Sequence, residues 1–186
     1  MLAAGFARRM GRQKLLLAFR GKPIVRWSVE ALAPHVEDLV VVTGGDDPTV
    51  REALAGVAVR FAPNPRPQDG QGSSIAIGVR ALAPLTDAVI IALGDQPRVP
   101  GEVVPTLLEA WRRTGRPIVV PVYRGVQGTP VLFGAQVFPE LATLMGDTGA
   151  RGVVATRRER VERVEFDRGM PSDVDTPEDY ARLRVE

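Results

Sequence analysis

The first fourteen residues, MLAAGFARRMGRQK, combine a glycine at position 5 with arginines at positions 8, 9 and 12 and with Lys14. Small residues let backbone N–H groups approach an anion closely, and cationic side chains neutralise its charge. Lysine is rare in this chain, since only two of its 24 basic residues are lysines. The spacing matches neither a Walker A loop nor the G-x-G-x-x-G of dinucleotide binders. The stretch predicts an anion-binding loop, with a solvated basic segment as the alternative.

Aspartates occur in two other stretches at positions suited to holding a metal ion. Asp95, in ALGDQP, ends the most apolar run of the chain, and Asp173 and Asp175 alternate in SDVDTPEDY. Hard cations such as Mg²⁺ take oxygen ligands, commonly one or two carboxylates together with substrate phosphates. Residues two apart in an extended segment share a face, so Asp173 and Asp175 could reach one ion. The structural alternatives are a turn cap at Asp95 and a helix N-cap at Asp175 or Thr176.

The segment GQGSSIAIG places Gly72, Ser73 and Ser74 at the start of an expected helix. Free N–H groups and hydroxyls there suit a ribose or a base, although serines at this position also serve as simple N-caps. The chain has one histidine, His35, and no cysteine. A catalytic triad or a zinc site would have to be built around His35, so hydrolase and zinc-enzyme functions are disfavoured.

Charge and hydropathy limit the classes of partner. The 24 Lys and Arg residues nearly balance the 22 Asp and Glu residues, so the net charge of +2 does not indicate nucleic acid as a partner. The tract TRRERVER (156–163) is interpreted as a solvated face rather than a nucleic-acid patch. No apolar run approaches the roughly 20 residues of a membrane helix, and no signal peptide is recognised. Together with the lack of cysteine, these features favour a cytoplasmic protein without a membrane partner.

Short β-branched runs bounded by turn residues predict strands, and apolar residues at helical spacing predict helices. The expected strands are 38–45, 57–64, 87–95, 116–123, 129–133 and 161–166. The expected helices are 23–33, 47–56, 73–83, 101–115, 135–144, 147–157 and 176–184. Their alternation predicts one α/β domain over residues 1–186, with a mostly parallel sheet covered by helices on both faces. In such a sheet, ligands bind at the carboxyl ends of the strands, where the stretches described above lie.

Six motifs span nearly the whole chain in order: LAAGFARRMGRQKLLLAFRGKPIV, GQGSSIAIGVRAL, ALGDQP, GTPVLF, GDTGAR and DVDTPEDY. Taken together, they resemble the MobA-like NTP transferases. LAAG in place of LAGG, and GDQP in place of a cysteine-containing counterpart, are most similar to the molybdenum cofactor cytidylyltransferase branch. The resemblance implies a Rossmann-like nucleotidyltransferase fold. It also implies transfer of CMP from CTP to the phosphate of molybdopterin, with release of pyrophosphate.

The resemblance further implies roles for individual residues. The nucleotide would contact Leu2, Ala3, Ala4, Gly5, Lys14, Gly72, Ser73 and Ser74. Catalysis would depend on Lys14, Arg9 and Asp95, while Asp95 and Asp175 would hold Mg²⁺, with Mn²⁺ as a substitute. The acceptor would contact Gly128, Thr129, Pro130, Asp147 and Arg151. A recipient molybdoenzyme would be a further partner.

Three features depart from the family pattern. Met1 directly precedes Leu2, so either the native chain starts upstream or the first strand is unusually short. Thr129 stands where family members often carry histidine, and Thr148 where they often carry lysine. Because both threonines fall on the acceptor side, two alternatives stay open. One is a related nucleotidyltransferase with another NTP or another phosphorylated acceptor, such as a sugar phosphate. The other is a non-catalytic nucleotide-binding protein that delivers a cofactor.

Overall fold

The computed structural model describes residues 1–5, 13–156 and 158–185, in which strands and helices alternate. The strands are β1 (Leu2–Ala3), β2 (Ala18–Phe19), β3 (Lys22–Pro23), β4 (Val40–Gly44), β5 (Arg60–Asn64), β6 (Ala88–Ile91), β7 (Ile118–Tyr123), β8 (Val126–Gln127), β9 (Val131–Gly134) and β10 (Val161–Phe166). The α-helices are α1 (Ile24–Leu32), α2 (Pro48–Ala53), α3 (Gln71–Arg80), α4 (Val103–Thr114), α5 (Phe138–Leu141), α6 (Arg151–Thr156) and α7 (Pro177–Val185). Every expected strand and helix has a counterpart, and the predicted α/β class is confirmed.

Strand β1 joins two groups of strands into one continuous sheet. It pairs in parallel with β4, which pairs in parallel with β5, and Leu2 forms a parallel bridge to Leu93 just after β6. Strand β9 runs antiparallel between β6 and β7, while β10 is parallel to β7. The spatial order is therefore β5-β4-β1-β6-β9-β7-β10. The direction of progression along the sheet reverses between β1 and β6, and such a switch point is where open α/β sheets bind ligands.

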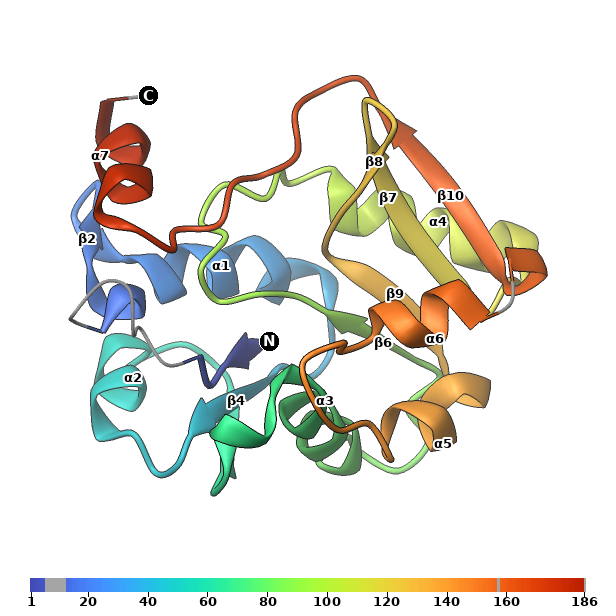
Figure 1. Ribbon diagram of the computed structural model, residues 1–186, viewed down its shortest axis with the longest axis horizontal. Coiled ribbons are helices and arrows are strands. Elements are labelled where there is room, and N and C mark those ends of the chain that lie inside the picture. The colour runs from blue at the N-terminus through green and yellow to red at the C-terminus, as the bar shows by residue number, and fades with distance from the viewer. Residues whose placement is uncertain (6–12, 157, 186) are drawn as a thin grey trace.

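Helices cover both faces of the sheet (Figure 1). Val25 of α1 and Val104 of α4 share a core cluster with Val41 of β4. Along β7, Ile118 packs into the cluster formed with α3, α5 and α6, while Val119 joins the cluster formed with α4. Neighbouring β7 residues thus point to opposite buried faces, as the two-residue period of a strand requires. This double burial explains why β7 is apolar along its whole length.

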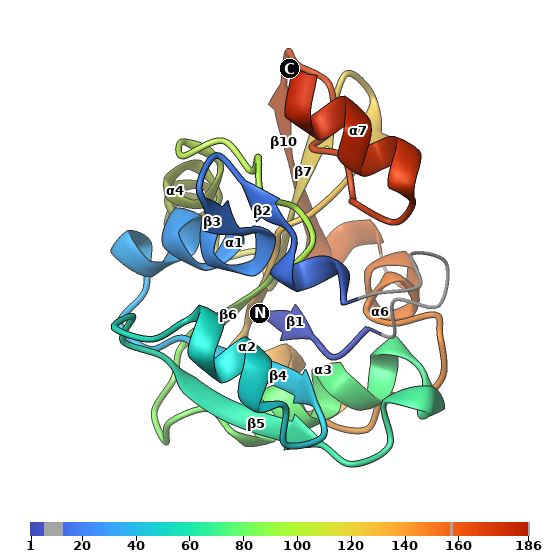
Figure 2. The same ribbon diagram turned by 90° about the vertical axis from the view of Figure 1, so that its left-hand side faces the viewer.

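The carboxyl-terminal helix α7 packs against the β2 region rather than against the distal end of the sheet (Figures 1 and 2). Leu183 and Val174 share an apolar cluster with Phe19. The Tyr180 hydroxyl donates a hydrogen bond to the Ala18 carbonyl oxygen at 2.6 Å. These contacts bring the acidic segment that precedes α7 back to the residues that follow β1.

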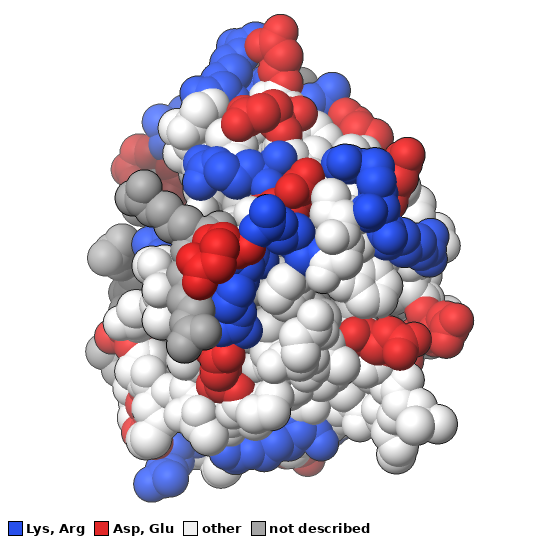
Figure 3. Space-filling view, turned by 90° about the vertical axis from the view of Figure 1, so that its right-hand side faces the viewer, with Lys and Arg blue, Asp and Glu red and all other residues white. Residues whose placement is uncertain are grey.

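Positive and negative side chains are interspersed on the face that includes α6 and β10 (Figure 3). Ion pairs join Arg113 to Glu162 at 3.2 Å and Arg160 to Glu140 at 2.8 Å. A mixture of this kind is typical of a solvated surface. Among the described residues, no helix combines the length and the apolar character needed to cross a membrane.

A cavity of about 350 Å³ lies at the amino-terminal ends of β1, β4 and β6. Its apolar lining includes Leu39, Ile90 and Trp111. The Met1 amino group donates to the Val40 carbonyl oxygen at 3.0 Å, and burial lowers the pKa of this amino group to about 5. The switch-point loops lie at the carboxyl ends of these strands, so the cavity is separate from the site described next.

Candidate active site

Backbone hydrogen bonds fix the carboxyl ends of β1 and β6 relative to each other. The Leu2 N–H donates to the Ala92 carbonyl oxygen at 2.8 Å, and the Gly94 N–H donates to the Leu2 carbonyl oxygen at 2.8 Å. A Cβ on Gly94 would lie 3.0 Å from that same Leu2 oxygen, so glycine permits the close approach. Asp95 follows immediately, which places its carboxylate beside the loop that leaves β1 after Ala3.

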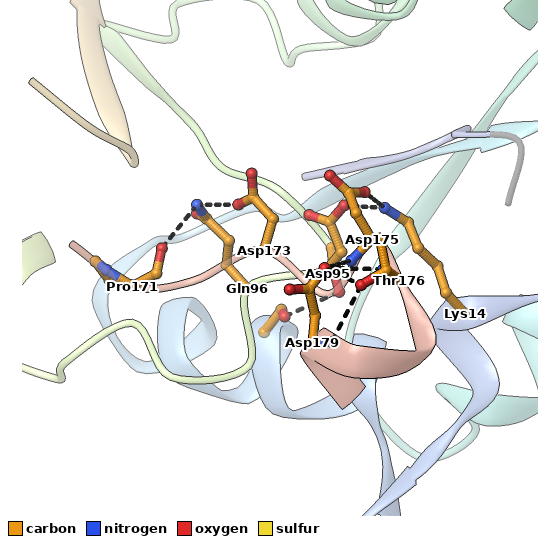
Figure 4. A network of polar contacts seen from close by, with 10 residues as sticks. Lys14, Asp95, Gln96, Pro171, Asp173, Asp175, Thr176 and Asp179 are labelled. Carbon is orange, nitrogen blue, oxygen red and sulfur yellow. Dashed lines mark hydrogen bonds and ion pairs between the residues drawn. The ribbon is translucent and has the colours of Figure 1, made fainter. Parts of the chain in front are cut away.

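Lys14 begins a short 3₁₀-helix (Lys14–Leu16) and points between two of the predicted carboxylates (Figure 4). Its Nζ donates to Asp95 Oδ2 at 2.5 Å and to Asp175 Oδ1 at 2.6 Å. The side chains of Lys14 and Asp95 are only 10% and 18% exposed, whereas that of Asp175 is 46% exposed. Burial lowers the pKa of Lys14, but the two carboxylates outweigh burial and raise this pKa above its ordinary value. Lys14 therefore keeps its positive charge at the switch point.

Asp175 is available to Lys14 because its neighbour caps α7. Thr176 Oγ1 accepts from the Asp179 N–H at 3.2 Å, and Asp179 Oδ2 accepts from the Thr176 N–H at 2.9 Å. This reciprocal pair is a capping box, and Pro177 at the first helical position has no N–H to satisfy. Of the two N-caps considered from the sequence, Thr176 is the one formed, and the Asp175 carboxylate remains available to the site.

Gln96 links the acidic segment to the predicted acceptor side. Its side chain is buried, its Nε2 donates to Asp173 Oδ1 at 2.6 Å, and its Oε1 accepts from Thr129 Oγ1 at 2.6 Å. Burial, together with the negative charge of Asp95, raises the pKa of Asp173. Sequence analysis did not select Gln96, although it lies inside the quoted GDQP motif, because a buried amide carries no signal in the sequence pattern.

The donor groups around Lys14 fit a hard divalent cation. Asp95 and Asp175 each place a carboxylate oxygen on the same Nζ, so the two oxygens converge on one cation. Two protein carboxylates completed by phosphate oxygens are the usual ligands of Mg²⁺ at nucleotide sites. Within the described part of the chain, no group of three or more His, Cys, Asp or Glu side chains is arranged to hold a metal ion. Asp173 accepts from Gln96 (Figure 4) whereas Asp175 pairs with Lys14, and a single ion shared by Asp173 and Asp175 stays a prediction.

The start of α3 is engaged in contacts within the protein. The Gly72 N–H donates to a carbonyl oxygen of the 145–146 loop at 2.8 Å, and a Cβ on Gly72 would lie 2.8 Å from the backbone of that loop. The Ser73 and Ser74 hydroxyls accept from Asn64 Nδ2 at 2.9 and 3.0 Å. The prediction that the Gly72 N–H and the two serine hydroxyls are free is therefore wrong, since these groups already have partners within the protein. Contact of these residues with a ribose or base stays a prediction.

The loop after β1 is described only at its two ends. Ala4 is buried, and Gly5 is exposed with open space where a Cβ would lie. Arg9, which is predicted to contact the triphosphate, lies outside the described residues. At the far end of the loop, Gln13 Nε2 donates to Asp47 Oδ2 at 3.2 Å, which anchors the returning chain to the N-cap of α2.

The predicted acceptor residues come from two segments, Gly128–Pro130 and Asp147–Arg151. A Cβ on Gly128 would lie 2.8 Å from the Tyr123 ring, and the Tyr123 hydroxyl donates to the Thr129 carbonyl oxygen at 3.0 Å. The first segment is therefore held on β7 and joined to the carboxylates through Gln96. Both ends of the second segment are exposed, and its amino end follows the loop that packs against α3.

A family model described as the MobA-like NTP transferase domain matches residues 1–163. The chain belongs to the MobA-like NTP transferase family. The resemblance seen in the six motifs is confirmed, and the protein is of a nucleotidyltransferase class. The matched region includes Lys14 and Asp95 but ends before Asp173 and Asp175, so the acidic segment lies beyond the family model.

Relatives match this family member along nearly its whole length. The molybdenum cofactor guanylyltransferase of Cereibacter sphaeroides is 32% identical over 185 residues, which are 98% of this chain and 92% of that protein. The purine catabolism protein PucB of Bacillus subtilis (strain 168) is 29% identical over 198 residues, with 98% and 93% covered. These names give a guanylyltransferase, not the cytidylyltransferase branch to which LAAG and GDQP are most similar.

Solved structures share the fold of this family member. Rv0371c from Mycobacterium tuberculosis H37Rv has a TM-score of 0.86 and 29% identity, covering 100% of this chain and 96% of its own. A complex of Rv0371C with manganese has a TM-score of 0.82 and 28% identity, covering 99% and 95%. A nucleotidyl transferase from Methanothermobacter has a TM-score of 0.78 and 27% identity, covering 99% and 94%. The Rossmann-like nucleotidyltransferase fold expected from the resemblance is confirmed.

Proposed function

We propose that this protein transfers a nucleoside monophosphate, CMP in preference, from an NTP to the phosphate of a molybdopterin-type acceptor in the cytoplasm. Pyrophosphate is the second product, and a molybdoenzyme receives the finished cofactor. The observation that carries the proposal is the convergence of Lys14, Asp95 and Asp175 from three segments at the switch point of the sheet. Family membership and the whole-chain likeness to a molybdenum cofactor guanylyltransferase support it.

The reaction needs charge control rather than a protein nucleophile. Attack of one phosphate on another brings negative charges together, so catalysis consists mainly of positioning and of neutralising charge on the α-phosphate and the departing pyrophosphate. Lys14 suits this role because its ammonium is a compact charge with three N–H donors. Two of those donors are directed at carboxylates here, and a phosphate oxygen is an equivalent acceptor. The buried position of Lys14 reduces screening of its charge by water.

We propose Asp95 and Asp175 as the residues that hold Mg²⁺, with Mn²⁺ as a substitute. When bound, the ion would act as a Lewis acid on phosphoryl oxygens. The printed description of Rv0371C as a complex with manganese supports a divalent cation in a related fold. Asp95 is the less exposed of the two carboxylates, so its charge is the less screened by solvent.

The base is the point on which the motifs and the relatives differ. LAAG and GDQP favour cytosine, while the guanylyltransferase relatives favour guanine as the second candidate. The acceptor is the next point, since Thr129 and Thr148 depart from the family pattern on that side. A different phosphorylated acceptor is therefore the alternative substrate.

The test is release of pyrophosphate with Mg²⁺ and each of CTP, GTP, ATP and UTP, with and without molybdenum cofactor. We expect release with CTP only when the cofactor is present. Release with GTP and the cofactor would identify guanine as the base. A further arm replaces the cofactor with a sugar phosphate, and release from an NTP only in that arm would identify a different acceptor. Binding of CTP without any release would point to the non-catalytic delivery protein. The Asp95→Ala variant serves as the negative control.

A further inference from the structure

We propose that Lys14 makes metal binding conditional on the nucleotide. Its ammonium keeps Asp95 and Asp175 paired until a triphosphate draws it away, and the divalent cation then takes its place on the two carboxylates. This inference rests on the proposed function, because it requires an NTP and a divalent cation at the same site.

The ammonium and the metal compete for the same carboxylate oxygens. The Nζ of Lys14 lies 2.5 Å from Asp95 Oδ2 and 2.6 Å from Asp175 Oδ1. A divalent ion held by those oxygens, at the usual distance of about 2.1 Å for Mg²⁺, would lie beside the ammonium. Two cations at that separation, in a site with little solvent, repel each other strongly. The carboxylates therefore hold one cation at a time.

The ammonium of Lys14 cannot move away from Asp95 and Asp175 without another anionic partner. Its side chain is 10% exposed, and an unpaired ammonium in such a position is strongly disfavoured. The flexible four-carbon stem of lysine allows Nζ to move while the backbone of the 3₁₀-helix stays in place. A triphosphate bound beside Lys14 would supply the missing anion. Exchange then keeps every buried charge paired, with Lys14 on phosphate and the metal on Asp95 and Asp175.

The competition links the affinity for the nucleotide to the affinity for the metal. Because both ligands favour the same displaced position of Lys14, each must raise the affinity for the other by the same factor. We expect a factor of at least about 10, within the usual range of such couplings. Removing the ammonium removes the competitor and should let the metal bind without nucleotide.

The experiment measures Mn²⁺ binding in the absence of nucleotide, by the electron paramagnetic resonance signal of free Mn²⁺. The proteins compared are the parent chain, Lys14→Met and Lys14→Gln. Lys22→Met is the matched control, since Lys22 is the other lysine and pairs with Glu30 at 2.6 Å. We expect both Lys14 variants to bind Mn²⁺ at least about 10-fold more tightly than the parent, and Lys22→Met to match the parent. Lys14→Gln keeps one donor for a carboxylate, so it covers the case in which Lys14→Met does not fold.

A second measurement separates failure of this inference from failure of the proposed function. Calorimetry of CTP binding at low and at saturating Mn²⁺ should show a gain in affinity for the parent and a smaller gain for the Lys14 variants. Formation of Mn–CTP in solution is the same for all proteins and drops out of the comparison. Equal Mn²⁺ affinity of the parent and both Lys14 variants would overturn the inference and leave the proposed function standing. Failure of the parent to bind CTP at any Mn²⁺ concentration would overturn both.

Discussion

Replacement of Gly72 by alanine sets two known effects against each other. Gly72 is the second residue of α3, and glycine in a helix interior is less favourable than alanine by about 1 kcal/mol. On helix propensity alone, Gly72→Ala should stabilise the protein. The new Cβ, however, would lie 2.8 Å from three backbone atoms of Met145. Backbone at this distance must move, and forced overpacking costs about 1–3 kcal/mol. We therefore expect a net loss of stability of up to about 2 kcal/mol.

Gly152 provides the matched control, because it is also the second residue of a helix, α6. A Cβ there would lie 3.5 Å from the Thr148 side chain, which is ordinary van der Waals contact. Gly152→Ala should leave stability unchanged or raise it by up to about 1 kcal/mol. Urea denaturation of both variants measures the difference, and the melting temperature should move by about 2–4 °C per kcal/mol in a chain of this size.

The Gly72 result also decides between two roles for this glycine. If Gly72 is required by packing of the 145–146 loop, Gly72→Ala lowers the free energy of unfolding. If Gly72 contacts a ribose directly, the variant instead raises the KM for the NTP and keeps the parent's stability. Unchanged stability of Gly72→Ala beside a stabilised Gly152→Ala would refute the packing argument.

Four further predictions concern the acidic residues and their cap. Asp95→Ala should retain the parent's circular dichroism and lose about 10²-fold or more in the rate of pyrophosphate release, as expected for removal of one electrostatic partner. Asp175→Asn should lose less than Asp95→Ala in the same assay, because Asp175 is 46% exposed. Burial raises the pKa of Asp173 in the folded protein, so stability of the parent falls as the pH rises through that pKa. Asp173→Asn keeps an acceptor for Gln96, so it should melt above the parent at pH 7, and this gain should disappear below about pH 4. Thr176→Ala removes the α7 cap and should cost about 1 kcal/mol in urea denaturation. Thr106→Ala removes a hydroxyl that donates to the Glu102 carbonyl oxygen within the first turn of α4 but caps no N–H, so it should cost less.

The order of elements was predictable because local chemistry determines it. The expected strand 116–123 became Ile118–Tyr123, and the expected helix 101–115 became Val103–Thr114, which ends at Gly115 in the left-handed conformation. Apolar runs and terminal glycines are short-range signals that survive tertiary packing. Helix bounds shifted where the signal is weaker, so that the expected helix 73–83 begins two residues earlier at Gln71.

Two hairpins escaped prediction because their turns lack the common sequence signal. The β2–β3 turn consists of Arg20 and Gly21, with φ of 47° and 81°. The β7–β8 turn consists of Arg124 and Gly125, with φ of 46° and 84°. Positive φ at both turn positions is the type I′ arrangement, which usually carries Asn-Gly or Asp-Gly. An Arg-Gly pair beside strands as short as β2, β3 and β8, which have two residues each, gives little basis for prediction.

The candidate site was predictable in its residue types and less so in its connections. Lys14 stood out because lysine is rare in this chain, and Asp95 because it ends the most apolar run. The structure brings the two side chains together. The bonds of Asn64 to two serine hydroxyls cross from the end of β5 to the start of α3, and the link through Gln96 joins residues far apart in the sequence. Such contacts depend on the register of several loops at once, and no local pattern in a single chain encodes them.

Strand β1, at the middle of the sheet, is two residues long and forms few backbone hydrogen bonds with its neighbours. On one side it holds β4, and on the other it meets the end of β6 through the backbone of Leu2. The pairings of β1 with β4 and with the end of β6 should therefore open transiently more often than the ladder of six residue pairs between β7 and β10. Deuterium should therefore replace the amide protons of Leu2 and Gly94 before that of Val120. Each opening would also loosen the placement of the Asp95 carboxylate, because Asp95 directly follows Gly94.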